Sequence, residues 1–275
     1  MTAFAALIGV DQRGPASLYL ASDSRVSWAD SDFRTWDYGR KVFASGRYPD
    51  VVGYVGDVLF ASLALGQIVA QLDAGVLVQD DAEPNERFDA IGRALRTSFG
   101  GLPQQEQRSF WVVYGGRAGE GMSCSFTLAV LVRSGSGWQE RRIDMPQCSS
   151  HVLLLGSGAT EIDRWDSWWR SSTQGRTTRA AFSAFCDAVS DEGDRHTGGA
   201  PQLVGVYRVG AARPFGVLWK GVPHLFGLPV APGSAGSHTN VEWRNSLFER
   251  VARDGSLLPG AQRHHAPKGL GGARG

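Results

Sequence analysis

Thr2 is the residue whose position in the chain could by itself do chemistry. It directly follows Met1, and because threonine is small, a methionine aminopeptidase would remove Met1 and leave Thr2 first. Its free α-amine would have a pKa of about 7.7–8.0, so a neutral fraction near pH 7 could take the proton of the adjacent hydroxyl. One residue would then supply both nucleophile and base. On position alone, however, Thr2 is only a common second residue.

Charged residues and glycines recur where strands are expected to end or begin. Ala-Ser-Asp-Ser-Arg occupies 21–25, Gly-Arg-Lys-Val-Phe occupies 39–43, and Val-Gly-Tyr-Val-Gly occupies 52–56. Further along, Leu-Leu-Leu-Gly-Ser-Gly occupies 153–158 and Asp-Arg-His-Thr-Gly-Gly occupies 194–199. Each segment alone has an ordinary explanation, since an Asp at a strand end is usually a turn acceptor and a strand Lys is usually solvated.

In this order, the segments resemble the proteasome β-subunit family of N-terminal nucleophile (Ntn) hydrolases, in its bacterial proteasome-related type. There the mature chain begins with Thr, Asp-Ser-Arg follows the second strand, a Lys lies in the third, and a glycine turn opens the first helix. Gly-Ser-Gly and Asp-x-x-Ser-Gly-Gly come later, and this chain has Thr197 in place of that Ser. The resemblance covers residues 2–220, but 100–145 and the part beyond 228 match nothing in it.

The resemblance implies a role for each matched residue near the nucleophile. Thr2 would attack, and the charge of Lys41 beside it would favour the alkoxide and disfavour protonation of the amine. Asp23 would keep Lys41 charged and oriented through a charge-assisted hydrogen bond. The N–H of Gly56, at the start of a helix, would stabilise the tetrahedral oxyanion.

Three downstream residues would surround this group. The resemblance implies that Ser157, Asp194 and Thr197 position the Thr2 amine and a water molecule. Arg25 is expected to brace the turn after the second strand rather than to touch the substrate.

Gly156 and Gly158, which follow a predicted strand, also suggest a dinucleotide-binding turn. The third glycine of that fingerprint would be Glu161, whose charge is unfavourable beside a pyrophosphate. His264 and His265 are adjacent but lack an accompanying carboxylate or cysteine cluster, so no metal site is expected. No cofactor is expected either.

Composition argues against several classes of function. The 275 residues include 28 basic and 27 acidic side chains, and the net charge of +1 gives no electrostatic reason to bind nucleic acid or an anionic membrane. No apolar run is long enough to span a bilayer, and the N-terminus lacks the basic segment of a secretory signal. The three cysteines lack CxxC spacing, so a reducing compartment, the cytoplasm, is expected.

The hydrophobic pattern predicts the elements that must position these residues. Short apolar or alternating runs predict strands over 3–10, 17–22, 41–43, 51–55, 109–114, 125–133, 138–143, 151–155, 202–209 and 214–220. Apolar residues at helical spacing predict helices over 58–72, 88–99, 162–169 and 182–189.

Helices that come in pairs between groups of strands disfavour an alternating βαβ sheet. They predict an α+β fold, a four-layer αββα Ntn-hydrolase sandwich in which two antiparallel sheets are flanked by helix pairs. Residues 1–228 are assigned to this domain, and 229–275 to a C-terminal extension with a helix near 240–252 and then a disordered tail. The residues expected to line that helix are Trp243, Leu247 and Val251.

The resemblance implies the function of a threonine-type amide-bond hydrolase, a peptidase acting on a peptide or protein with Thr2 as nucleophile. By resemblance, the chain would form a homo-oligomeric ring, and any unfoldase partner is left open. One alternative is a catalytically inactive, proteasome-like structural subunit of such a ring, and another is a nucleotide-binding module. Residues 26–38, with Trp28, Phe33 and Trp36, are candidates for the walls of the substrate pocket.

Overall fold

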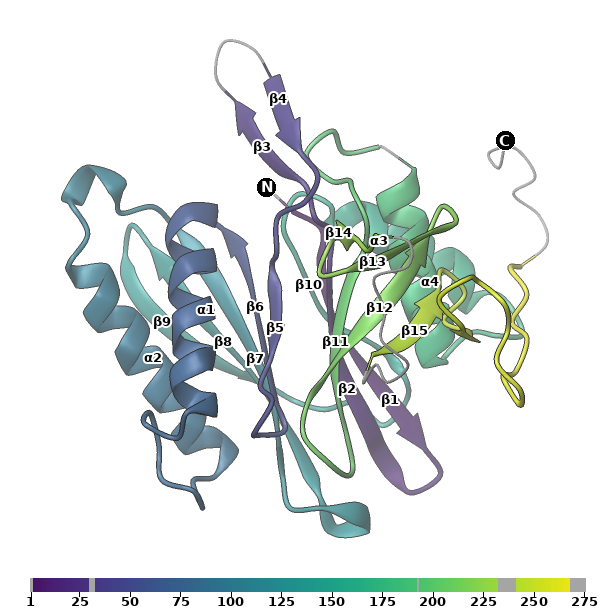
Figure 1. Cartoon of the computed structure of the whole chain (residues 1–275), viewed down its shortest axis with the longest axis horizontal. Helices are drawn as coiled ribbons and strands as arrows, with labels where there is room; N and C mark the ends of the chain where they lie inside the picture. The colour runs from purple at the N-terminus through teal and green to yellow at the C-terminus, as the bar shows by residue number, and fades with distance from the viewer. Residues whose placement is uncertain (1, 30–32, 192, 232–240, 268–275) are drawn as a thin grey trace.

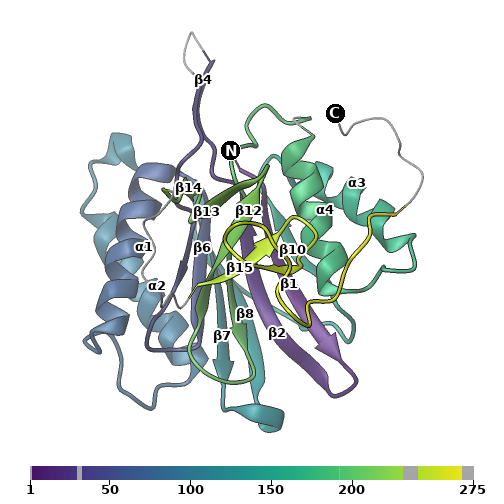
Figure 2. The same cartoon turned by 45° about the vertical axis from the view of Figure 1, so that its right-hand side comes forward.

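The computed structural model describes residues 2–29, 33–191, 193–231 and 241–267. It has four layers: a helix pair, two sheets face to face, and a second helix pair on the opposite side (Figures 1 and 2). The predicted α+β sandwich of two sheets between helix pairs is therefore confirmed.

The first sheet is built around the N-terminal hairpin. Its strands run in the order β10-β1-β2-β11-β12-β13-β14, and β15 pairs with β12. The bounds are β1 Phe4–Asp11, β2 Gly14–Ser22, β10 Ser150–Leu155, β11 Gln202–Tyr207, β12 Arg213–Trp219, β13 Val222–Leu225, β14 Leu228–Pro229, β15 Glu242–Asn245 and β16 Arg250–Val251.

The second sheet is an antiparallel meander of five strands, ordered as in the chain. They are β5 Val42–Ala44, β6 Asp50–Gly56, β7 Phe110–Ala118, β8 Ser125–Ser134 and β9 Gly137–Ile143. The segment 100–145, which matched nothing in the resemblance, thus supplies β7, β8 and β9. Alternating apolar residues put one face of these strands against the first sheet and the other against the helices.

Each helix pair covers the outer face of one sheet (Figure 1). The helices are α1 Val58–Asp73, α2 Pro84–Gly100, α3 Ala159–Arg170 and α4 Thr178–Ser190. The Asp57 side chain accepts the N–H of Phe60 at the start of α1, and Thr177 accepts that of Ala180 at the start of α4. Such caps satisfy backbone donors that the first turn leaves free.

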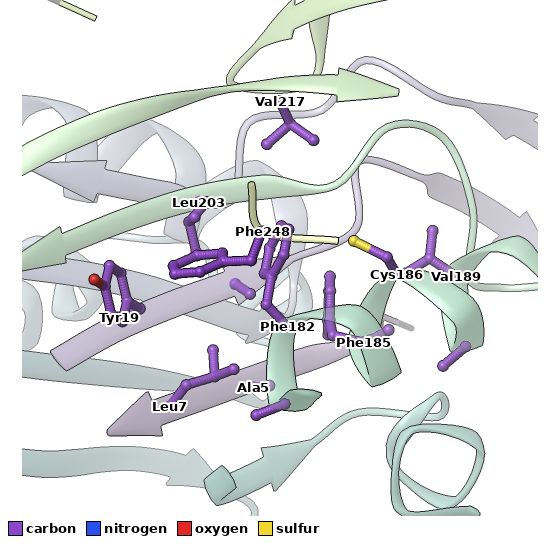
Figure 3. Close-up of a cluster of buried hydrophobic side chains, with 14 of the residues drawn as sticks. Ala5, Leu7, Tyr19, Phe182, Phe185, Cys186, Val189, Leu203, Val217 and Phe248 are labelled. Carbon is purple, nitrogen blue, oxygen red and sulfur yellow. The ribbon is translucent and has the colours of Figure 1, made fainter. Parts of the chain in front are cut away.

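Three apolar layers hold the sandwich together. Phe4 and Ile8 of β1 point between the two sheets, as does Leu20 of β2. Ala5 and Leu7 of β1 point the other way, toward α4. Figure 3 shows this outer layer, in which side chains of the first sheet pack against Phe182 and Phe185 of the helix. Strand β1 is thus apolar on both faces, which fixes the chain start within the molecule.

A hairpin of β3 Val26–Ala29 and β4 Phe33–Trp36 projects from the molecule next to the start of β1 (Figure 1). The sequence pattern predicts no strand over 26–38 and offers these residues only as candidates for the wall of the substrate pocket. Its base is anchored by Arg25, whose guanidinium forms two hydrogen bonds with Asp37 at 2.7 and 2.9 Å. Arg25 therefore braces this turn, as expected.

The helix expected near 240–252 is wrong. Residues 242–245 instead form β15, which runs parallel to β12 and leaves Trp243 packed over Gly216. Asn245 then closes a turn in which its side chain accepts the N–H groups of Leu247 and Glu249. The three apolar residues have helical spacing, but this weak preference is overridden by hydrogen bonds to the free edge of β12 and by the turn that Asn245 closes.

The expected disordered tail is also wrong for the described part of the C-terminus. His264 is buried, its N–H is bound by Glu249, and its ring lies 5.2 Å from that of Trp169. Residues 268–275 lie outside the described residues. The region assigned as an extension continues the first sheet and packs on the second helix pair.

Among the described residues, no helix combines the length and apolar character needed to cross a membrane.

Candidate active site

The register of the N-terminal hairpin brings the start of β1 to the end of β2. Phe4 pairs with Ser22, so Thr2 and Ala3 lie beside Asp23. Ala3 donates its N–H to Asp23 Oδ1 at 3.1 Å, and the Asp23 N–H returns a bond to the Ala3 carbonyl at 3.1 Å. Thr2 is 2% exposed, so this corner of the sheet holds the Thr2 side chain inside the protein.

Lys41 reaches this corner from the other sheet, one residue before β5. Its Nζ lies 2.8 Å from Thr2 Oγ1, 2.7 Å from Asp23 Oδ1 and 2.6 Å from the Arg25 carbonyl oxygen. An ammonium has three N–H donors, and each finds one oxygen. Lys41 is fully buried, so this charge is compensated by protein alone.

Burial and pairing act in opposite directions on the two charges. Burial lowers the pKa of Lys41 Nζ, and the neighbouring carboxylate of Asp23 opposes that shift. Burial likewise raises the pKa of Asp23, and Lys41 together with the N–H groups of Gly198 and Ala3 opposes it. A carboxylate with several donors and an ammonium with three acceptors stabilise each other as an ion pair.

A second polar group lies across the start of β1. Ser157 Oγ donates to Asp194 Oδ2 at 2.5 Å, and Thr197 Oγ1 donates to the same oxygen at 2.9 Å. The other oxygen accepts the His196 N–H at 3.0 Å. Burial raises the pKa of Asp194, but these hydrogen bonds outweigh it and hold the pKa below its usual value.

Backbone contacts join the two groups. The Gly158 N–H lies 3.3 Å from the carbonyl oxygen of Thr2, and the Gly198 N–H donates to Asp23 Oδ2 at 3.1 Å. Gly156 has φ 87°, and a Cβ there would lie 1.9 Å from the Thr2 carbonyl oxygen. The strand-to-helix junction before α3 therefore requires glycine because it touches the backbone of Thr2 itself.

Six of the seven residues singled out from the sequence are joined by these contacts. They are Thr2, Asp23, Lys41, Ser157, Asp194 and Thr197. Gly56 is different: it ends β6 with φ 109° and, among the described residues, shares no hydrogen bond with the other six. A Cβ at Gly56 would lie 2.8 Å from the Ser109 carbonyl oxygen, so both the positive φ and the packing require glycine there.

Gln202 is the positioning residue that the sequence reading missed. Its side-chain oxygen accepts the Lys41 N–H at 3.0 Å, and its amide donates to the carbonyls of Asp23 at 3.0 Å and Gly39 at 2.7 Å. Gln202 is fully buried. It links the backbones of Asp23 and Lys41. In the sequence, the one feature that could have indicated this role is a polar residue at the first position of an otherwise apolar strand.

The β3–β4 hairpin stands next to this site. Ser27 Oγ lies 3.0 Å from His196 Nδ1, and the Phe33 ring lies 5.0 Å from the same imidazole. Trp28 and Trp36 are about half exposed on the hairpin. The aromatic residues proposed as pocket wall thus lie on an element that contacts the Asp194–Thr197 loop.

Within the described part of the chain, no group of three or more His, Cys, Asp or Glu side chains could hold a metal ion. The polar side chains that meet at the site carry three hydroxyls, one ammonium and two carboxylates.

Comparison with known proteins gives structural neighbours only. No family model matches the chain. No curated protein matches it either. Among solved structures, it is similar to Anbu (ancestral beta-subunit) from Yersinia bercovieri, with 11% identity over 77% of this chain and 86% of that chain and a TM-score of 0.49.

Two further structures are similar to the same degree. Eukaryotic HslV from Trypanosoma brucei has 12% identity over 75% of this chain and 99% of that chain, with a TM-score of 0.45. Anbu from Hyphomicrobium sp. strain MC1 has 10% identity over 77% of this chain and 86% of that chain, with a TM-score of 0.47. The more specific resemblance to a bacterial proteasome-related type stays a prediction.

Proposed function

We propose that this protein is an amide-bond hydrolase, a peptidase, whose nucleophile is Thr2 after removal of Met1. The observation that supports this most directly is the 2.8 Å contact between Lys41 Nζ and Thr2 Oγ1. A buried ammonium beside a hydroxyl favours the alkoxide form of that hydroxyl. Met1 lies outside the described residues, so its removal is part of the proposal.

In the first half of the reaction, the freed α-amine of Thr2 takes the hydroxyl proton and Oγ1 attacks the carbonyl carbon of the substrate. Lys41 stabilises the negative charge while the new C–O bond forms, and Asp23 keeps Lys41 in place. The C–N bond then breaks, and the leaving amine takes the proton from the Thr2 ammonium. An ester between Thr2 and the acyl part of the substrate remains.

In the second half, a water molecule takes the place of the released amine product. The Thr2 amine takes a proton from that water, the hydroxide attacks the ester carbon, and Oγ1 leaves with the proton. Ser157, Asp194 and Thr197 are proposed to orient the amine and the water, because Asp194 is held ionised by both hydroxyls. The oxyanion donor is proposed to be the N–H of Gly56, which lies at the junction between β6 and α1.

The aromatic hairpin beside the site favours a peptide rather than a small polar amide as substrate. An extended peptide can pair its backbone with an exposed strand edge and place side chains against Trp28 and Phe33. A homo-oligomeric ring, with or without an unfoldase, would restrict entry to unfolded chains. Both assembly features belong to the proposal.

The decisive experiment is intact-mass measurement of the purified protein, before and after treatment with an N-terminal-threonine-reactive inhibitor. We expect loss of Met1, one covalent adduct per chain, and loss of turnover of fluorogenic peptides. A Thr2→Ala variant should lose Met1 but form no adduct. Retention of Met1 in the native protein, or an adduct that survives in Thr2→Ala, would contradict the assignment and favour an inactive structural subunit or another nucleophile.

A further inference from the structure

A cavity lies at the end of β1 opposite to Thr2. It has a volume of about 610 Å³, within the range of small-molecule sites. Its walls come from the β1–β2 hairpin, the start of α4, the segment around β15 and residues 260–262. The charged residues of the lining are Arg176, Arg179, Arg244 and Arg250, and Tyr19 and Phe248 are its aromatic residues.

The charge of this lining is entirely positive. Four arginines face the cavity, and no lining residue is a carboxylate. Glu242, just outside, pairs with Arg244 and lies 3.5 Å from Arg250 Nε, so it offsets part of the charge. No hydrogen bond or ion pair of Arg176 is found among the described residues, whereas Arg179 donates from Nη1 to the Gln262 carbonyl at 3.2 Å. In a chain of net charge +1, such a local surplus is a feature of this cavity rather than of the whole protein.

The first turn of α4 opens into the same cavity. Thr177 caps the helix by accepting the N–H of Ala180, while the N–H groups of Thr178 and Arg179 have no intrahelical acceptor. The helix dipole adds a partial positive charge at this end. Backbone donors and guanidinium groups together form the arrangement that binds phosphate oxygens in proteins.

Arg244 holds a charge in a fixed position at the wall of the cavity. It is 7% exposed, its Nη2 is bound by Glu242 and lies 3.5 Å from the Tyr207 hydroxyl, and its Cζ lies 4.9 Å from the centre of the Phe248 ring. Because these contacts already order the guanidinium, binding of an anion would not have to immobilise this side chain. Tyr19 and Phe248, whose rings lie edge to face at 5.5 Å, also line the cavity and are labelled in Figure 3.

We propose that this cavity binds the phosphate group of a small phosphorylated molecule. The guanidinium groups of Arg176, Arg179 and Arg244 would bind the phosphate oxygens, and the first turn of α4 would complete the site. The apolar side formed by Tyr19 and Phe248 leaves room for an organic part of the ligand, as in a nucleoside phosphate.

The cavity is separate from the proposed catalytic site. Val10 is eight residues further along the extended chain than Thr2, which corresponds to roughly 26 Å. Its occupation therefore does not depend on hydrolysis, and neither Thr2 nor Lys41 lines it.

Isothermal titration calorimetry of the full chain with inorganic phosphate and with ATP, in chloride buffer without divalent metal, tests this proposal. We expect saturable 1:1 binding of at least ATP and a tenfold or larger loss of affinity in Arg176→Gln/Arg179→Gln, since two charge-assisted contacts with the phosphate oxygens would be lost. The matched control is Arg93→Gln/Arg141→Gln, which removes the same charge from exposed positions on α2 and β9.

The two probes also identify the part of the ligand that is recognised. Equal affinities for inorganic phosphate and ATP would assign the site to the phosphate group alone, and tighter binding of ATP would assign the apolar side to the organic part. Absence of saturable binding by both probes would overturn the proposal. So would equal losses in the cavity and control variants, because unspecific charge attraction would then explain the heat.

Discussion

At the residue scale, the site depends on one lysine whose donors are all used. Lys41 Nζ contacts the Thr2 hydroxyl, a carboxylate and a backbone carbonyl, so its position is fixed from three directions. A side chain with free rotation could not keep its charge within 3 Å of a hydroxyl. This fixed geometry, rather than the presence of a threonine, makes the corner suited to nucleophilic chemistry.

Substitution of Thr2 should change the rate of hydrolysis without changing the fold. Thr2→Ala should lower peptide hydrolysis by about a thousandfold or more, because the attacking oxygen is lost while the surrounding charges remain. Thr2→Ser keeps a hydroxyl beside Lys41 and should retain measurable turnover. Fluorogenic-peptide assays at equal protein concentration compare the two, and equal activity of Thr2→Ala and the native protein would place the nucleophile elsewhere.

Removing one charge of the buried pair should cost more stability than removing both. Lys41→Met leaves Asp23 without its partner, which typically costs about 3–5 kcal/mol. The double variant Asp23→Asn/Lys41→Met leaves no buried charge and should be more stable than the single variant. Urea unfolding of the three proteins measures this, and a double variant less stable than Lys41→Met would refute the pairing.

The lowered pKa of Asp194 predicts a pH dependence with a definite sign. Its folded-state pKa lies below the unfolded value of about 3.9, so its stabilisation is complete above that pH and is lost as the pH falls through the folded-state pKa. The difference in melting temperature between the native protein and Asp194→Asn should be constant near neutral pH and shrink below about pH 4.

The control for this experiment is Asp163→Asn, an exposed carboxylate on α3. That variant should differ little from the native protein at every pH. A difference for Asp194→Asn that grows as the pH falls would show that this carboxylate is not held ionised in the folded state.

The residues of the site could largely be found from the sequence, because their order and spacing carry information along the chain. Gln202 could not, since its effect depends on reaching the backbones of Asp23, Gly39 and Lys41 from a strand more than 160 positions away. A side-chain amide that joins distant backbones leaves no local pattern. The catalytic roles themselves stay predictions until activity is measured.

At the scale of elements, the junction between β10 and α3 limits the position of the Thr2 backbone more closely than any other contact described above. Gly156→Ala would place a Cβ against the Thr2 carbonyl, so we expect loss of hydrolysis through displacement of Thr2. Gly221→Ala is the control, because its φ of 79° is similar to 87° at Gly156 but nothing lies within 4 Å of the added carbon. Both variants carry left-handed strain of about 1–2 kcal/mol.

Activity and thermal unfolding of the two glycine variants should therefore diverge. Gly221→Ala should keep full activity with a slightly lower melting temperature. If Gly156→Ala also keeps full activity, the close approach to Thr2 has no catalytic consequence.

Most helices and strands followed from the hydrophobic pattern, because each has at least one apolar face over several turns or residues. The incorrect and missing predictions share a cause. They concern segments whose secondary structure is decided by contacts with distant parts of the chain. Trp243, Leu247 and Val251 fit a helix in spacing, yet the free edge of β12 offered hydrogen bonds to a strand. The short β3–β4 hairpin has no buried apolar face of its own to reveal it.

At the scale of the whole molecule, the C-terminal region is part of the core. Phe248 packs against Phe182 at 5.2 Å and against Tyr19 at 5.5 Å, and it is 8% exposed. Phe248→Ala should lower the free energy of unfolding by about 3–5 kcal/mol. Leu228→Ala, at a position 54% exposed, should change it by less than about 0.5 kcal/mol.

Chemical denaturation of both variants measures the contrast. Equal stability of Phe248→Ala and the native protein would contradict the assignment of Phe248 to the core.

The parallel pairing of β15 with β12 has a consequence for biosynthesis. Gly216–Leu218 hydrogen-bond β13 on one edge and β15 on the other, and β15 is translated more than 20 residues later. Until those residues leave the ribosome, the nascent chain presents a bare edge in the middle of its larger sheet. Ribosome stalling shortly after β13 should therefore yield chains that aggregate or are retained by chaperones, although every proposed catalytic residue has already been made.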